Sequence, residues 1–207
     1  RARMSSITDR YRAVRAEPLA RVAGLSAEDC QAQSMPDASP AKWHLAHTTW
    51  FFDKFILEAY SPSHSVQPDF DRLYNSYYAA VGPRLNRGMR GLLSRPTMDE
   101  VLRYRREIDA GIAALLSRND VAQHVIQRIE LGINHEQQHQ ELLLTDIHHA
   151  FASNPLRQVY DERKAPGTEV AGVPLSWISG ESGIAEIGHA GSGFSFDNEG
   201  PAHRVFL

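Results

Sequence analysis

The chain has 207 residues, of which 42% are hydrophobic and 23% charged, a composition typical of a globular protein with one substantial core. A net charge of −3 gives no basic surface for nucleic acid, and no apolar run is long enough to cross a membrane, so neither is expected as a partner. The single cysteine, Cys30, excludes an internal disulfide bond and favours a cytoplasmic protein.

The first predicted helix covers residues 5–23, where apolar side chains recur at helical spacing. Pro18 is expected to kink or divide this helix, because proline donates no backbone hydrogen bond. Residues 24–38 are predicted to form a loop.

The second predicted helix runs from Pro40 to about Tyr60. Ser39 supplies an N-cap residue, and Pro40 occupies the first helical position, where proline is favoured. His44 lies about one turn before His47, so spacing alone does not exclude it from the broad face of this helix. That face carries His47 among four aromatic residues, Trp43, Trp50, Phe51 and Phe55.

The segment 61–95 is predicted to be long and irregular, because prolines and glycines interrupt it repeatedly. Such a loop is uncommon in a compact domain and is often functional. The tyrosines in it are either core residues or proton donors beside a metal. The arginines are either solvated or form a planar donor group that captures a substrate carboxylate. These residues are Tyr77, Tyr78, Arg84, Arg87 and Arg90.

Two further helices are predicted after this segment. A capping-box pattern at Thr97 begins a helix that reaches about Ser117. A longer helix is predicted from Asn119 to about Ala152. The four helices together predict an antiparallel bundle with a site in its core.

The long helix contains the clearest candidate for chemistry. His135 and His139 are four residues apart, so both imidazoles lie on one helix face and can share a divalent metal ion. Two histidines do not complete a metal site, and His47 is the third candidate because an unpaired imidazole would be poorly placed among aromatic residues. The alternative is that His135 and His139 are partly exposed or hydrogen-bonded core histidines, and that His47 is a core histidine with its hydrogen bonds satisfied.

A second alternative is a zinc peptidase, since His135, Glu136 and His139 match the His-Glu-x-x-His motif with the glutamate as general base. Two features argue against it. The glycine and histidine extension of such motifs does not follow His139, and Glu141 places a charge where a peptidase helix would pack.

The composition changes after the bundle, which is assigned to residues 5–155. Residues 156–168 are polar and predict a linker. Residues 169–207 are rich in glycine with short apolar alternations, a β-type pattern, but they are too few to bury a sheet alone. We expect them to begin a second, β-rich domain whose remainder is missing here or is supplied by another chain.

Six stretches carry motifs that are weak singly and specific in combination. They are Ser39–Phe52, Leu73–Tyr78, Val81–Arg84, Gly91–Thr97, Asn134–Glu141 and Phe194–Val205. Over almost the whole chain they resemble the ergothioneine-pathway sulfoxide synthases of the EgtB type. The resemblance implies an α + β protein, with a DinB-like four-helix bundle followed by the beginning of a domain of the C-type-lectin or formylglycine-generating-enzyme type at residues 169–207.

The resemblance also implies mononuclear non-haem Fe(II) bound by His47, His135 and His139, the same residues that the spacing of the pair and the aromatic surroundings of His47 indicate. Family members use O2 to join a thiol to the imidazole C2 of hercynine (trimethylhistidine) as a sulfoxide. In the branch that uses free cysteine rather than γ-glutamylcysteine, one of two tyrosines would donate a proton during the oxygen reaction, Tyr77 or Tyr78. The carboxylate and amine of cysteine would be bound by Arg87 or Arg84 together with Gln138.

Two other functions stay open. The chain could be a sister enzyme that acts on another histidine derivative or uses a selenium donor. It could also be a DinB-like metal-binding module that transfers thiols or serves as a non-catalytic partner. In the resembled family the C-terminal domain supplies much of the substrate pocket, so residues 1–207 alone are expected to bind metal and to need the rest of that domain for activity.

Overall fold

The central helix of the fold is α3 (Ala41–Phe52), all of whose residues are buried. In the computed structural model, residues 6–61, 64–161 and 172–207 are described. They belong to two units, Arg1–Tyr160 and Asp161–Leu207, each of which is considered by itself.

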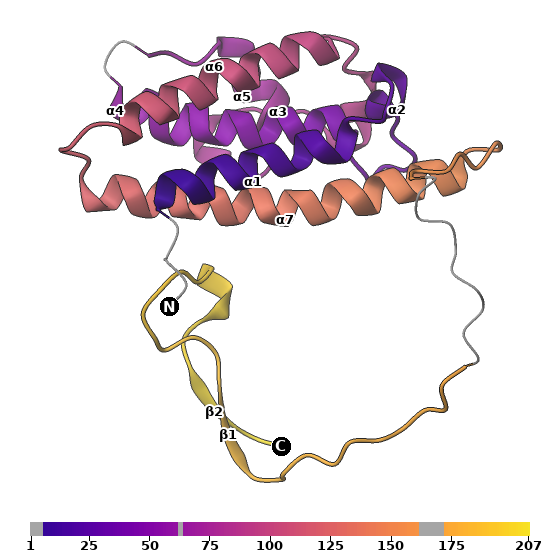
Figure 1. Cartoon of the computed structure of the whole chain (residues 1–207), viewed down its shortest axis with the longest axis vertical. Coiled ribbons are helices and arrows are strands. Elements are labelled where there is room, and N and C mark those ends of the chain that lie inside the picture. Colours follow the sequence, from indigo (N-terminus) through magenta and orange to yellow (C-terminus); the bar gives the residue numbers. More distant parts are fainter. Residues whose placement is uncertain (1–5, 62–63, 162–171) are drawn as a thin grey trace. The chain divides into compact units, whose positions relative to one another are not determined.

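Four long helices of the first unit pack side by side as the predicted bundle (Figure 1). The helix α3 contacts α6 and α7, and α7 also contacts α1. In the described ranges, no helix combines the length and the apolar character that crossing a membrane requires. The bounds of the three helices around α3 are Ile7–Val22 for α1, Met98–Leu116 for α6 and Gln123–Ser153 for α7.

The helix predicted from Pro40 to Tyr60 is present, but its beginning and its end differ from the prediction. After α3 the chain continues through a π-helical turn, η1 (Asp53–Leu57), into α4 (Glu58–Tyr60). Ser39 is not the N-cap, because Pro40 takes that position without a side-chain cap. The Ser39 hydroxyl instead accepts a hydrogen bond from Arg90 (2.9 Å).

Two segments predicted to be irregular contain helices. The first is α2 (Ala27–Gln31), which lies within the predicted loop and begins with a capping box at Ser26. The second is α5 (Pro68–Tyr74), in which the proline at the first turn begins a helix rather than interrupting a loop. Two short 3-10 turns follow it, η2 (Ala79–Val81) and η3 (Arg87–Leu92).

The capping box predicted at Thr97 is confirmed. The Thr97 hydroxyl accepts from the backbone N–H of Glu100 (3.2 Å), and the Glu100 carboxylate accepts from the backbone N–H of Thr97 (2.7 Å). Pro18 does not divide α1 but lies buried inside it. The long helix α7 begins at Gln123, a few residues later than predicted.

A buried ion network joins the four helices of the bundle. The carboxylate of Glu136 on α7 is fully buried and accepts hydrogen bonds from Arg15 on α1 (2.8 Å) and from Arg105 on α6. Arg15 also donates to Thr49 on α3 (3.1 Å) and to Asp109 on α6 (2.6 Å). Because buried charges are tolerated only when they are paired, this network fixes the rotation of α7 relative to the other three helices.

The second unit contains an antiparallel pair of strands, β1 (Ile184–Ile187) and β2 (His203–Phe206). Ile184 lies opposite Phe206, and Ile187 lies opposite His203. A 3-10 turn, η5 (Asp197–Glu199), lies between the strands in the sequence. The β-type pattern predicted for this part of the chain is therefore confirmed at both strands.

The predicted linker, residues 156–168, lies partly outside the described residues, which omit 162–168. Its beginning, residues 156–160, belongs to the first unit and packs against it. The hydroxyl of Tyr160 donates to the backbone carbonyl of Arg21 (2.7 Å), and its ring lies against those of His148 and Phe151. The first unit extends to Tyr160.

Gly132 allows α7 to approach α3 closely beside the histidine pair. A Cβ added to Gly132 would lie 2.6 Å from Cε1 of Phe52 and 3.1 Å from Cε1 of Phe51. We expect Gly132→Ala to lower the free energy of unfolding by about 1–3 kcal/mol, because buried rings must move. Urea unfolding followed by circular dichroism measures this. The control is Gly24→Ala, whose added Cβ meets nothing within 4 Å; an equal loss in both variants would contradict the explanation.

Candidate metal centre

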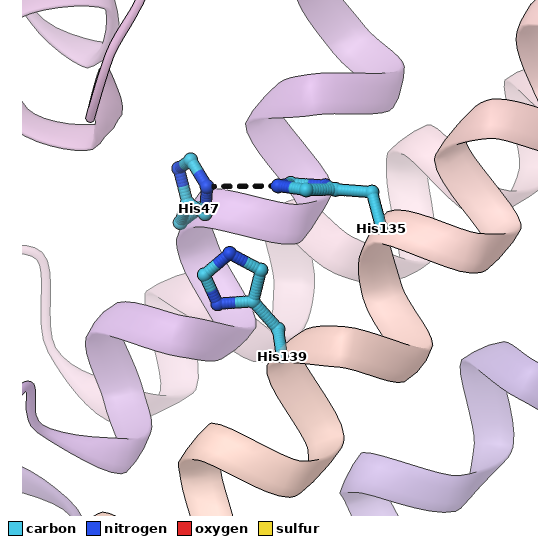
Figure 2. Close-up of side chains that lie close together, drawn as sticks. All are labelled: His47, His135 and His139. Carbon is cyan, nitrogen blue, oxygen red and sulfur yellow. Dashed lines mark hydrogen bonds between the residues drawn. The ribbon is translucent and has the colours of Figure 1, made fainter. Parts of the chain in front are cut away.

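Three histidines from two helices converge in the bundle. His47 lies on α3, and His135 and His139 lie one turn apart on α7. One ring nitrogen of each lies within 4.8 Å of the others, and Figure 2 shows the three rings turned toward one another. The three side chains predicted as metal ligands are therefore brought together.

His47 is oriented by a hydrogen bond on the far side of its ring. Its Nδ1 donates to the backbone carbonyl of Tyr74 (2.6 Å), one of the terminal carbonyls that a helix leaves without an internal partner. A neutral imidazole carries one proton, so Nε2 of His47 keeps its lone pair. That Nε2 lies 3.3 Å from Nε2 of His135 (Figure 2).

The spacing of the ring nitrogens fits a shared ion. Two nitrogens that each lie about 2.1 Å from one metal are about 3.0 to 3.4 Å apart for angles between octahedral and tetrahedral. The separation of 3.3 Å between His47 and His135 falls within that range. Nδ1 of His135 is buried and has no hydrogen-bond partner among the described residues, so hydrogen bonding alone does not account for the placement of this imidazole. The three residues can hold a metal ion.

Burial keeps the three imidazoles neutral, which is the form that binds metals. Loss of hydration lowers the pKa of His135 from 6.5 to about 4. Loss of hydration, followed by the charge of a neighbouring histidine, holds the pKa of His47 and that of His139 well below the usual range. A metal ion therefore does not have to displace protons from these rings at neutral pH.

Aromatic rings enclose the site on two sides. Trp43 stacks on His47 with the ring centroids 4.6 Å apart, and the centroid of Phe51 lies 4.7 Å from that of His135. Tyr78 packs against Phe51, with centroids 6.3 Å apart, so this predicted proton donor is separated from His135 by one ring. Burial raises the pKa of the Tyr78 hydroxyl, which therefore stays protonated at neutral pH.

The other predicted site residues lie at the surface of the first unit. Tyr77 is 74% exposed, and the side chains of Gln138, Arg84 and Arg87 are exposed as well. Their assignment to proton donation and substrate binding stays a prediction.

Of the three arginines noted in the sequence, Arg90 is buried and stacks on Trp43, the ring that packs against His47. The guanidinium of Arg90 is 3.4 Å from a ring centroid of Trp43 and donates to the hydroxyls of Ser39 (2.9 Å) and Ser76 (3.1 Å). Burial lowers its pKa to about 10. Spacing could not distinguish Arg90 from its two neighbouring arginines, because two of the residues that it contacts, Ser39 and Trp43, are distant in the sequence.

Two residues that were not assigned to the site lie behind His139. Nδ1 of His44 is 2.9 Å from Nδ1 of His139, and Nε2 of His44 is 3.0 Å from a carboxylate oxygen of Asp146. Helical spacing indicates that both residues share a helix face with a candidate ligand, since His44 lies one turn before His47 and Asp146 lies two turns after His139.

The position of Glu136 argues against a peptidase. Both of its carboxylate oxygens accept hydrogen bonds from buried arginines, Arg15 and Arg105. The charges of these arginines lower the pKa of Glu136 against the opposing effect of burial. A carboxylate engaged in this way is not available as a general base beside the imidazoles.

Comparison with known protein families identifies the DinB superfamily, which matches residues 10–143. The matched range includes His47, His135 and His139 together with most of α1 and all of α3 and α6. No curated protein was found that matches the chain.

The lowered histidine pKa values predict how stability depends on pH. In the unfolded chain these rings bind protons near pH 6.5. In the folded protein His135 binds a proton only near pH 4, and the pKa values of His47 and His139 also lie well below the usual range. The free energy of unfolding of the metal-free protein should therefore fall as the pH falls from 6.5 toward 4.

Urea unfolding at about pH 7 and about pH 5 measures this loss. His135→Gln, which cannot titrate, should show a smaller loss than the wild type. The control is His124→Gln, an exposed position on the same helix, and it should behave as the wild type. The explanation fails if all three proteins lose the same stability.

Proposed function

The chain belongs to the DinB superfamily, and from this premise we propose that it is an iron-dependent oxidoreductase that forms a carbon–sulfur bond. The proposed reaction is that of a sulfoxide synthase of ergothioneine biosynthesis, in which O2 joins the sulfur of cysteine to the imidazole C2 of hercynine. The observation that carries the proposal is the convergence of His47, His135 and His139, within motifs that resemble those of such enzymes.

Fe(II) is the proposed ion. Imidazole ligands suit iron and zinc alike, so this choice rests on the oxygen chemistry of the proposed reaction. His47, His135 and His139 would hold the ion, and three protein ligands would leave room for the thiol, the imidazole of hercynine and O2. When bound, iron would supply the redox chemistry and favour the thiolate form of cysteine.

The atoms and electrons of the proposed reaction balance. Hercynine loses the hydrogen on C2 and cysteine loses its thiol hydrogen as the C–S bond forms. One oxygen atom of O2 becomes the sulfoxide oxygen, and the other leaves as water with the two hydrogens. Bond formation and sulfur oxidation each release two electrons, so O2 is a sufficient oxidant.

Arginines form the proposed cysteine-binding group, and Arg90 is the buried one among them. The guanidinium of Arg90 is held by two hydroxyls and an aromatic face, and no ion pair to it is present among the described residues. It therefore offers a buried positive charge to a carboxylate. Arg87 or Arg84, with Gln138, would bind the cysteine carboxylate and amine from the exposed side.

Tyr77 and Tyr78 are the proposed proton donors. The raised pKa of Tyr78 keeps a proton available at neutral pH, and its ring packs in the aromatic wall next to His135.

A second candidate is a DinB-like metal-binding module that transfers thiols or has no catalytic role. It is supported by the same family membership and the same histidine cluster, neither of which requires oxygen chemistry. A sister enzyme that acts on another histidine derivative, or on a selenium donor, would use the site in the way proposed for hercynine and cysteine.

The reaction itself is the first test. With the natural full-length protein, we expect hercynine, cysteine, Fe(II) and O2 to give a product whose mass exceeds the sum of the two organic substrates by one oxygen less two hydrogens. Omitting any one component should abolish it. Mass spectrometry and an oxygen electrode measure the outcome, with γ-glutamylcysteine, unmethylated histidine and a selenium donor in parallel. Metal binding without oxygen consumption would favour the second candidate and contradict the proposal.

The tyrosine pair provides a second test. Loss of a proton donor should lower kcat by about 100- to 10,000-fold with little change in KM, and we expect this for Tyr78→Phe or Tyr77→Phe. Steady-state rates of sulfoxide formation measure it. Tyr60→Phe, on α4, is the control and should retain wild-type rates. If both variants of the pair also retain them, the assigned proton donors are wrong.

A further inference from the structure

A chain of hydrogen-bonding groups runs from Asp146 through His44 to His139. One carboxylate oxygen of Asp146, Oδ2, lies 2.8 Å from the backbone nitrogen of Ser39 and 3.0 Å from Nε2 of His44. On the other side of the same ring, Nδ1 of His44 lies 2.9 Å from Nδ1 of His139. These hydrogen bonds link Asp146 on α7 to His44 on α3, and His44 in turn to His139 on α7.

The direction of each hydrogen bond follows from the carboxylate at one end. An ionised carboxylate only accepts hydrogen bonds, so the proton on His44 lies on Nε2, which donates to Asp146. A ring that carries its single proton on Nε2 leaves Nδ1 as an acceptor. Among the described residues, the hydrogen-bond partner of this Nδ1 is Nδ1 of His139, which must therefore donate. The single proton of His139 is thereby placed on Nδ1, and Nε2 keeps its lone pair.

We propose that Asp146 and His44 are positioning residues, which fix His139 in the tautomer whose Nε2 can bind a metal ion. This inference rests on the three-histidine site of the proposed function and concerns the residues behind it. The proposed metal ligand His139 would then be held as His47 is, where the carbonyl of Tyr74 accepts the Nδ1 proton. Such partners behind a ligating histidine set its orientation and its basicity.

Burial makes this arrangement more than a surface contact. The side chain of His44 is 3% exposed and that of Asp146 is 12% exposed, so water competes little for their hydrogen bonds. The backbone N–H of Ser39 also holds Asp146 in place at the start of α3. Because α3 carries both His44 and His47, one carboxylate on α7 aligns the two helices that supply the ligands.

The tautomer of His139 in the metal-free protein is the direct test. In the wild type, the ¹⁵N chemical shifts of the His139 ring should show Nδ1 protonated and Nε2 unprotonated. In His44→Phe and in Asp146→Leu this preference should be lost, because no acceptor then holds the proton on Nδ1. Asp146→Asn is the conservative variant, since its amide oxygen can still accept from Ser39 and His44, and it should keep the wild-type tautomer.

Metal affinity gives a second readout. Titration with Fe(II) without oxygen, and with Co(II), against a competing chelator should show about 10- to 100-fold weaker binding in His44→Phe and Asp146→Leu. Asp146→Asn should bind close to the wild type. The matched control is Glu141→Gln, which removes an exposed carboxylate from the same helix and should change neither the tautomer nor the affinity.

The outcomes separate this inference from the proposed function. A wild-type His139 with its proton on Nε2 would overturn the inference, and so would a His44→Phe protein that binds Fe(II) as tightly as the wild type. If the wild type binds no metal although His139 carries its proton on Nδ1, the arrangement of Asp146 and His44 stands and the proposed iron enzyme does not. If metal binds through His44 itself, loss of His44 would remove one imidazole from the X-ray absorption spectrum of the Co(II) protein and would contradict the positioning role.

Discussion

The carboxylate of Glu136, buried between two guanidinium groups, is the constraint on which the candidate site depends. Arg15 brings α1 to this carboxylate, Arg105 brings α6, and Arg15 also bonds to Thr49 on α3. Removing one partner of such a buried group typically costs about 3–5 kcal/mol, so the rotation of α7 about its axis is strongly fixed. With Glu136 turned into this network, the neighbouring His135 and the histidine one turn later face His47 on α3.

Features that depend on local spacing could be predicted from the sequence. Histidines four residues apart must share a helix face, and this placed His135 and His139 together without any knowledge of the fold. The capping box at Thr97 is equally local, because its two hydrogen bonds lie within one turn. The third ligand, His47, needed a further argument from its aromatic surroundings, and the packing of α3 against α7 brings it to the pair.

Features that depend on distant contacts could not be predicted in this way. Pro68 lies in the segment predicted to be irregular, yet it begins α5, a helix too short to show a periodic pattern. This helix supplies the carbonyl that orients His47. The burial of Arg90 comes from the stacking of its guanidinium on Trp43 across nearly fifty positions of sequence. Asp146 has a role only because α3 lies against α7. Helical repeat thus indicates the pair His135 and His139, whereas the packing of α3 against α7 brings His47, His44 and Asp146 together with that pair.

The central claim is that three neutral imidazoles from two helices bind one redox-active ion. Anomalous X-ray scattering at the iron edge, from crystals grown with Fe(II) in the absence of oxygen, tests it most directly. The account predicts one iron peak about 2.1 Å from a ring nitrogen of each of His47, His135 and His139. A map with no iron peak there, and with the rings hydrogen-bonded only to protein or water, would contradict it.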